Sequence, residues 1–305
     1  MARIVVAGSL HMDIVVHAPR LPVQGETLAG RHWSLRVGGK GGNQAIQAAY
    51  QGAESIMIGR VGQDDFGQRL RAALTVAGVD IRHVRTDPST GSGMSAAIID
   101  ERGDYGAVIV PGANLNLCRD DVAESGALDG ADCLLLQYEI RLDHVASIAQ
   151  LAHERGVRVI LNAAPAYPAP AGLLDAVDVL VVNEVEAAML LSQTVASVDE
   201  GLQAAQALSQ SSKAAVVTLG GRGVAFCAAG ETPQLVVAHQ VAVVDMHGAG
   251  DAFIGALAVR LAEGDDLALA VRYANATGAL AVSRQASSEG LKPILPDEVR
   301  ALLQA

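Results

Sequence analysis

The 305-residue sequence predicts an α/β fold with a mostly parallel central sheet flanked by helices. Two observations support this class. Short runs of Val, Ile and Leu alternate with longer Ala- and Leu-rich segments, as in repeated βα units. The short runs also lack polar alternation, as strands do when helices cover both faces of their sheet. We expect a single domain spanning residues 1–305.

The expected elements follow each other along the whole chain. The apolar runs expected as strands are 4–7, 55–58, 133–137, 157–161, 179–182 and 215–219. The segments expected as helices are 42–51, 64–77, 142–154, 184–191, 199–210, 250–263 and 265–283. Two stretches, about 13–37 and 92–111, contain β-type runs without a long helix. We expect these insertions to form a small sheet that serves as a lid, a dimer surface or both; the alternative is ordinary surface hairpins.

Composition excludes several classes of protein. The chain carries 22 Lys and Arg against 33 Asp and Glu, for a net charge of -11, and only 3% aromatic residues. It therefore lacks the basic and aromatic surfaces of a nucleic-acid binder. The sequence has no apolar stretch long enough for a membrane span, and its first apolar run is too short for the signal peptide of a secreted protein, so we expect neither. Its cysteines, at 118, 133 and 227, show no metal-ligand spacing, so we expect a cytoplasmic protein.

A glycine-rich segment precedes the first expected helix. Gly38, Gly39, Gly41 and Gly42 surround Lys40, and Asn43 follows. Glycines permit close backbone approach, the lysine supplies a cation, and a loop that opens a helix can hold a phosphate or a polyol. The spacing matches neither a P-loop nor a dinucleotide-binding motif. The alternative is a flexible glycine turn.

A second glycine segment runs into the apolar helix expected at 250–263. Gly248, Ala249 and Gly250 would present amide groups at a helix N-terminus, where the macrodipole favours the charge that develops on a transferring phosphoryl group. Asp251 would lie in the first turn and could accept a proton from an attacking hydroxyl. The alternative is that Asp251 only caps its helix.

Two further motifs follow expected strands. The first, from Thr218 to Gly223, is a glycine loop at the carboxyl end of a strand, where open α/β sheets bind nucleotides; a tight hairpin into 224–228 is the alternative. The second contains Asn183 and Glu186, whose oxygens suit Mg²⁺, although such a pair at a helix start can simply be a cap. His11, Asp13 and Glu139 also follow strands, at the edge of the sheet where ligands bind.

Taken in order, these motifs resemble those of the ribokinase-like (PfkB-type) sugar kinases over essentially the whole chain. The segments that carry the resemblance are 8–13, 38–45 with its downstream glycines Gly52 and Gly62, 111–114, 183–186, 218–223 and 245–251. The resemblance implies a three-layer fold with a small β-sheet lid, which would also form a homodimer. It implies ATP-dependent phosphorylation of a sugar hydroxymethyl group, with D-ribose converted to ribose 5-phosphate.

The resemblance also implies roles for individual residues. Asp251 would be the general base, and Gly248, Ala249 and Gly250 would form the anion hole. The implied sugar contacts are His11, Asp13, Gly39, Lys40, Asn43, Glu139 and Asp251. The implied ATP contacts are Asn183, Thr218, Leu219, Gly220, Gly221, Arg222, Gly223, Gly250 and Asn275. Glu186 would hold Mg²⁺ through water, and a K⁺ site would involve Asp245, His247, Ala281, Arg284, Ala286 and Gly290.

His11 leaves the acceptor open, because the ribose-phosphorylating members of this family have Asn at that position. Another pentose, a ketohexose or a nucleoside is the alternative substrate. Met246 and Gly290 also depart from the family pattern near the implied K⁺ site. From a different functional class, a non-catalytic sugar- or nucleotide-binding regulator is the alternative; a nicotinamide dehydrogenase is a more distant one, because no glycine motif for a dinucleotide follows the first strand.

Overall fold

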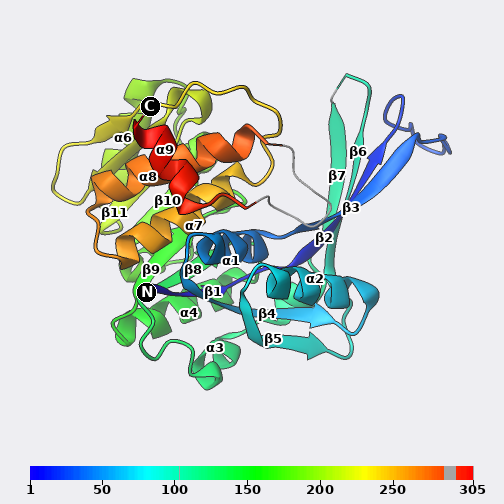
Figure 1. Cartoon of the computed structure of the whole chain (residues 1–305), viewed down its shortest axis with the longest axis horizontal. Helices are drawn as coiled ribbons and strands as arrows, with labels where there is room; N and C mark the ends of the chain where they lie inside the picture. The colour runs from blue at the N-terminus through cyan, green and yellow to red at the C-terminus, as the bar shows by residue number, and fades with distance from the viewer. Residues whose placement is uncertain (103, 285–292, 305) are drawn as a thin grey trace.

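The computed structural model describes residues 1–102, 104–284 and 293–304, and its main body is built on a nine-stranded sheet (Figure 1). The strand order is β13-β12-β11-β10-β9-β8-β1-β4-β5, and all neighbours from β11 to β5 are parallel. β12 and β13 extend one edge in antiparallel fashion. The strands are β1 (Arg3–Ala7), β4 (Glu54–Gly62), β5 (Asp80–Asp87), β8 (Cys133–Gln137), β9 (Arg158–Asn162), β10 (Val179–Asn183), β11 (Ala214–Thr218), β12 (Val224–Ala228) and β13 (Gln234–Val236).

Helices cover both faces of this sheet, so the expected three-layer α/β class is confirmed (Figure 1). Alternate residues of β1 enter two separate cores: Ile4 and Val6 join the core under α1, α7 and α8, while Val5 and Ala7 join the core over α4. The helices are α1 (Lys40–Tyr50), α2 (Asp65–Val76), α3 (Arg119–Ser125), α4 (Leu142–Glu154), α5 (Glu184–Leu191), α6 (Val198–Leu208), α7 (Ala249–Ala262), α8 (Leu267–Val282) and α9 (Pro296–Gln304).

Local capping explains where several helices begin. Asp64, Ser197 and Asp266 each accept a hydrogen bond from a backbone N–H of the first turn of α2, α6 and α8. Such caps satisfy amides that have no acceptor within the helix. The six predicted strands and seven predicted helices are confirmed; α3, α9, β5 and β13 were not predicted. None of the described helices combines the length and apolarity that crossing a bilayer would require.

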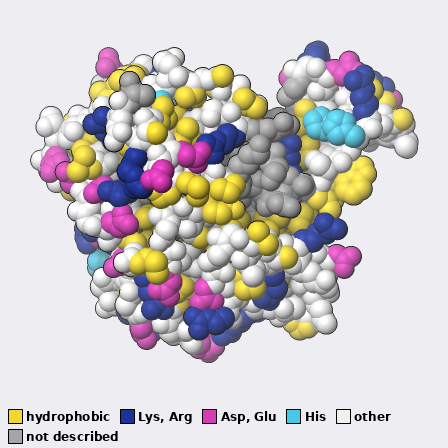
Figure 2. Space-filling model, viewed as in Figure 1, with side chains coloured by type: hydrophobic (Ala, Val, Ile, Leu, Met, Phe, Trp, Pro, Cys, Tyr) yellow, Lys and Arg dark blue, Asp and Glu magenta, His cyan; other side chains and the backbone are white. Residues whose placement is uncertain are grey.

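A second, four-stranded sheet contains β2 (His11–His17), β3 (His32–Gly38), β6 (Gly93–Ile99) and β7 (Tyr105–Val110). Its order is β3-β2-β6-β7, with the two outer pairs antiparallel and β2 parallel to β6. The two insertions therefore join in one sheet and are not separate hairpins. Figure 2 shows this small sheet as a lobe that stands apart from the body.

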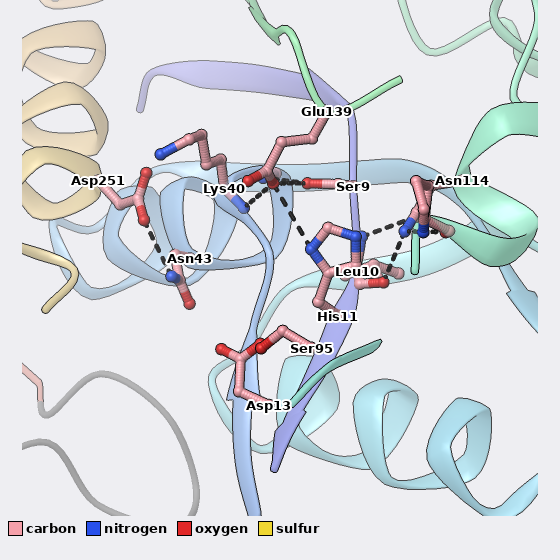
Figure 3. A network of polar contacts seen from close by, with 12 residues as sticks. Ser9, Leu10, His11, Asp13, Lys40, Asn43, Ser95, Asn114, Glu139 and Asp251 are labelled. Carbon is pink, nitrogen blue, oxygen red and sulfur yellow. Dashed lines mark hydrogen bonds and ion pairs between the residues drawn. The ribbon is translucent and has the colours of Figure 1, made fainter. Parts of the chain in front are cut away.

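The register gives the small sheet two different faces. Trp33, Val108 and Val110 share one face and are exposed, at 66%, 67% and 49%. Asp13 and Ser95, which are paired in register, lie on the opposite face. Asp13 is among the groups shown in Figure 3 beside the glycine-rich segment, so the polar face of the small sheet borders the candidate site.

Candidate active site

Asp251 is the third residue of α7 and lies in its first turn. Gly248, the residue before the helix, has a left-handed φ of 75°. Its side chain is buried and accepts two hydrogen bonds from α1. Asn43 Nδ2 donates to Oδ2 over 2.9 Å, and Gln44 Nε2 donates to Oδ1 over 3.0 Å. The N-cap residue of α7 is Gly248, which has no side chain, and both oxygens of Asp251 bond to α1, so the alternative of a capping role receives no support. The carboxylate is instead fixed by a neighbouring helix (Figure 3).

One positive charge and two amides oppose the effect of burial on the pKa of Asp251. Burial raises the pKa of the Asp251 carboxyl, while the charge of Lys40 and the amides of Asn43 and Gln44 act against that rise. Burial also disfavours the Lys40 ammonium, yet the carboxylates of Asp251, Glu139 and Glu186 raise the pKa of Lys40. Lys40 therefore stays protonated at neutral pH and supplies the positive charge of the site.

Glu139 joins the glycine-rich segment to the start of the chain. Its Oε2 accepts from Ser9 Oγ over 2.5 Å and from the Lys40 backbone N–H over 2.9 Å. His11 Nδ1 lies 3.7 Å from the same oxygen, and the His11 side chain is 5% exposed. Gly39 makes this packing possible: its φ is 90°, and a Cβ there would lie 2.7 Å from the backbone nitrogen of His11. The sequence thus brings His11, Lys40, Asn43, Glu139 and Asp251 together.

Asp13 faces the loop before α7 from the small sheet. It accepts from Ser95 Oγ over 2.5 Å, and His247 Nε2 lies 3.9 Å from its other oxygen. Arg36, which pairs with Asp13 in the β2–β3 register, has Nη1 3.6 Å from Asp245 Oδ2. The small sheet therefore contacts the segment that leads to the candidate base.

Asn183 and Glu186 cap the start of α5 reciprocally. The capping role that the sequence offered as the alternative to Mg²⁺ binding is therefore present. Glu186 accepts from both nitrogens of Asn183, at 2.8 and 3.0 Å, while Asn183 Oδ1 accepts from the Glu186 N–H over 2.9 Å. Burial raises the pKa of Glu186, which faces the charge of Lys40. The described residues contain no cluster of three or more His, Cys, Asp or Glu that could hold a metal ion.

The segment from Thr218 to Gly223 turns from β11 into β12, so the hairpin alternative is confirmed here. Leu219 is 1% exposed and packs into the core, so only its backbone can face a ligand. Arg222 pairs with Glu184 of α5. By contrast, a Cβ at Gly220, Gly221 or Gly250 would meet no atom within 4 Å, so backbone is openly accessible at these positions.

The remaining predicted residues occupy varied positions. Asn275 is buried and donates to the Val237 carbonyl over 2.9 Å, which anchors the chain after β13. The Val244 and Asp245 N–H groups bond the Val282 carbonyl, bringing this loop to the end of α8 beside Ala281. Arg284 pairs with Glu298 of α9 at 2.5 Å. Ala286 and Gly290 lie outside the described residues.

Sequence reasoning missed several polar groups that support the site. Gln44 and Gln137 are fully buried, and Gln137 Nε2 donates to Gln44 Oε1 over 2.7 Å. Asn114 binds both backbone groups of Leu10, accepting from its N–H and donating to its carbonyl, each over 2.9 Å (Figure 3). Adjacency to Asn43 was the one available signal for Gln44; nothing local marked Gln137.

Comparison with known proteins identifies relatives along nearly the full chain. Residues 1–294 match the model of the pfkB family carbohydrate kinases. The chain is 35% identical over 297 residues to a ribokinase of Bacillus subtilis, covering 95% of this chain and 96% of the relative. It is 32% identical over 288 residues to a ribokinase of Haemophilus influenzae, covering 94% of each. The solved structure of Arabidopsis thaliana ribokinase complexed with ribose and ATP superposes with a TM-score of 0.92, at 31% identity and 100% coverage of both chains.

Proposed function

The chain belongs to the pfkB family of carbohydrate kinases, and we propose that it transfers the γ-phosphoryl group of ATP to D-ribose, forming ribose 5-phosphate. The observation that carries this proposal is the buried Asp251 carboxylate at the N-terminus of α7, with Lys40, Asn43 and Glu139 grouped beside it. The similarity to ribokinases, one of them solved with ribose and ATP, supports the choice of substrate.

In the proposed reaction, the primary hydroxyl of ribose gives its proton to Asp251 as its oxygen forms a bond to the γ-phosphorus. The bond between that phosphorus and the bridging oxygen breaks, and ADP leaves with the electron pair. Little covalent chemistry is asked of the protein, so positioning and charge stabilisation dominate. The amides of Gly248, Ala249 and Gly250 would stabilise the charge on the phosphoryl oxygens, aided by the dipole of α7. The Ala249 N–H, which donates to the Met246 carbonyl over 3.4 Å, would exchange that acceptor for the phosphoryl group.

We assign sugar binding to His11, Asp13, Gly39, Lys40, Asn43 and Glu139. Support comes from the clustering of their polar atoms beside Asp251 and from one unused acceptor. Asn43 Oδ1 is buried and has no hydrogen-bond partner among the described residues, although Nδ2 of the same amide bonds Asp251. A buried acceptor of this kind is costly unless a ligand or water satisfies it. A sugar hydroxyl would satisfy it.

We assign ATP to the edge of the sheet formed by Asn183, Asn275 and the segment from Thr218 to Gly223, together with Gly250. Mg²⁺ usually keeps several waters and binds nucleotide phosphates. The donor set fits that mode: Glu186 already accepts two hydrogen bonds, so it would reach the ion through water. For K⁺, we assign Asp245 and carbonyls near His247 and Ala281. The Arg36 guanidinium lies 3.6 Å from the Asp245 carboxylate, so the ion would share that carboxylate with a second positive charge.

We further propose that the small sheet closes over the sugar and that its other face forms a homodimer. The polar face carries Asp13 and Arg36 toward the loop before α7, as closure requires. The opposite face exposes Trp33, Val108 and Val110, an apolar surface that a second copy would cover. The free state of all three cysteines agrees with a cytoplasmic setting, which stays a prediction.

The position of His11 favours testing other phosphoryl acceptors beside ribose. The imidazole of His11 packs against Glu139, so it limits the space and the hydrogen bonds offered to a sugar there. ADP release should therefore be measured with ribose, other pentoses, fructose and adenosine, with and without K⁺. Ribose is expected to give the highest kcat/KM. A higher value with fructose or adenosine would replace the proposed substrate. If none of the acceptors led to ADP release, a non-catalytic binding protein would be favoured instead.

A further inference from the structure

A network of three buried amides connects the central sheet to the Asp251 carboxylate: Gln137 and Asn162 both bond Gln44, and Gln44 bonds Asp251. Gln137 at the end of β8 donates to Gln44 Oε1 over 2.7 Å, and Gln44 Nε2 donates to Asp251 Oδ1 over 3.0 Å. The same Nε2 also donates to Asn162 Oδ1 of β9 over 3.3 Å. Gln44 and Gln137 are each 0% exposed. Every polar atom of the Gln44 amide is therefore used inside the protein.

The oxygens of Asp251 and Asn162 together favour one orientation of the Gln44 amide. If the amide turned over, its oxygen would face the Asp251 carboxylate and Asn162 Oδ1, and its NH₂ would face the NH₂ of Gln137. Two acceptor pairs would then be buried without hydrogen bonds, which is strongly unfavourable. Asn162, whose Nδ2 donates to the Val181 carbonyl over 3.3 Å, thus keeps an N–H of Gln44 directed at Asp251, and Gln137 satisfies the Gln44 oxygen.

Gln44 differs from its neighbour Asn43, although both donate to Asp251. Asn43 retains a buried acceptor without a partner, and we assign that atom to the sugar. Gln44 has no atom left for a ligand. The charged groups that face Asp251 are Lys40 of α1 and Glu139 after β8, with opposite effects on the carboxylate. A charge-assisted hydrogen bond from Gln44 adds to the effect of Lys40.

We propose that Gln44 is a positioning residue for the general base, held by Gln137 and Asn162 so that it keeps the Asp251 carboxylate ionised and in a fixed plane. This inference rests on the proposed function, because it takes Asp251 as the base. It assigns to Gln44 no contact with sugar or nucleotide. Gln44 should accordingly act on kcat and on its pH dependence, and little on KM.

The test compares Gln44→Met with the wild-type enzyme over a range of pH. Methionine preserves the volume and removes the donor. We expect kcat at neutral pH to fall roughly 10- to 100-fold, since a hydrogen bond to a charged group is lost. KM for sugar and ATP should stay within about threefold, because neither ligand touches the residue. The acid limb of the kcat profile should move to higher pH, with part of the loss recovered at alkaline pH.

Gln47→Met is the matched control. Gln47 is a fully buried glutamine of the same helix, and its Nε2 donates to the Ile294 carbonyl over 3.2 Å, away from Asp251. This variant should lose stability without moving the acid limb. Gln137→Met should move the limb in the same direction as Gln44→Met, by a smaller amount, because Asn162 still orients the amide. A fall in kcat for Gln44→Met with an unmoved limb would overturn the proposal.

A second measurement does not depend on turnover or on the identity of the sugar. The Asp251 carboxyl can be titrated by ¹³C NMR with labelled aspartate, and its signal assigned by its loss in Asp251→Asn. Its pKa should be higher in Gln44→Met than in the wild type, and unchanged in Gln47→Met. If no sugar is phosphorylated but this shift occurs, the proposed function fails while the contact stands. If ribose is phosphorylated but the pKa is unmoved, the positioning role fails.

Discussion

Arg36 of β3 lies 3.6 Å from Asp245, so an ion pair links the small sheet to the loop that leads into α7. Both side chains are about a fifth exposed, at 22% and 21%. Arg36→Met should lower kcat/KM for the sugar by up to about fivefold, the range of a partly solvated pair. The deficit should shrink at high salt, because ions screen the pair in the wild type. Steady-state kinetics at two ionic strengths would measure both effects.

The matched control for this change is Arg20→Met, which removes an ion pair with Glu26 in the same small sheet region. That pair is exposed and does not reach the body of the protein. Its loss should leave kcat/KM unchanged. Equal effects of the two variants would show that the small sheet is merely destabilised and that its contact with Asp245 has no part in sugar binding.

Asp251→Asn tests the general base directly. The variant should fold and bind ATP normally, while kcat falls roughly 10²- to 10⁴-fold because the proton acceptor is gone. Single-turnover phosphate transfer and ATP titration by calorimetry would separate chemistry from binding. Activity near that of the wild type would remove Asp251 from the mechanism.

Lys40→Met should change the pH dependence of the reaction. Burial raises the pKa of Asp251, and the Lys40 charge limits that rise. The base works only when ionised, so activity falls as pH drops through its pKa; without Lys40 this acid limb should move to higher pH. The measurement is kcat against pH. Lys213→Met, which removes a surface pair with Asp178, is the control and should leave the limb in place.

Gly39→Ala should reduce stability more than the same substitution at a glycine of similar φ elsewhere. Gly39 and Gly52 have nearly the same left-handed φ, 90° and 88°, but only at Gly39 would a Cβ meet backbone, 2.7 Å from the His11 nitrogen. Gly52→Ala should cost about 1 kcal/mol of unfolding free energy from backbone strain alone. Gly39→Ala should cost about 1–3 kcal/mol more and raise KM for the sugar. Urea unfolding and kinetics test this; equal costs would contradict it.

Trp33→Glu tests the proposed dimer. Trp33 is 66% exposed on the apolar face of the small sheet, so a charge there should prevent association without unfolding the body. Sedimentation of the wild type is expected to give a dimer and that of the variant a monomer. A monomeric wild type would refute the proposal. Val76→Glu, at an 83% exposed position on α2, is the control and should leave the state of assembly unchanged.

The buried parts of the fold were predictable because their signal is local. Strands such as β8 and β10 are apolar runs that end in a single polar residue, a pattern typical of strands in a sheet covered on both faces. β5 escaped prediction because it is an edge strand in which Arg82, Arg85 and other polar residues interrupt the pattern. The seven residues of α3 are too short to show helical periodicity.

The site was predictable where its residues stand in glycine-rich motifs, as Lys40, Asn43 and Asp251 do. Its supporting groups were not, because their meaning depends on distant partners. Gln44 and Asp251 are 207 positions apart, and a buried glutamine in a helix has no distinguishing local pattern. Likewise, the capping of α5 by Asn183 and Glu186 is visible in sequence, whereas the proximity of Glu186 to Lys40 exists only in the fold.

The bonds of Asn114 to Leu10 have a mechanical consequence. The chain crosses between the body and the small sheet at four points, near Leu10, Gly39, Gly93 and Pro111. A Cβ on Gly39 would lie 2.9 Å from Leu10 Cα, and a Cβ on Gly93 would lie 2.8 Å from the Leu10 carbonyl oxygen. Asn114, which follows Pro111, bonds both the N–H and the carbonyl of Leu10. All four crossings therefore converge on one residue. The small sheet is therefore joined to the body around a single residue, and the far ends of its strands lie beyond that junction.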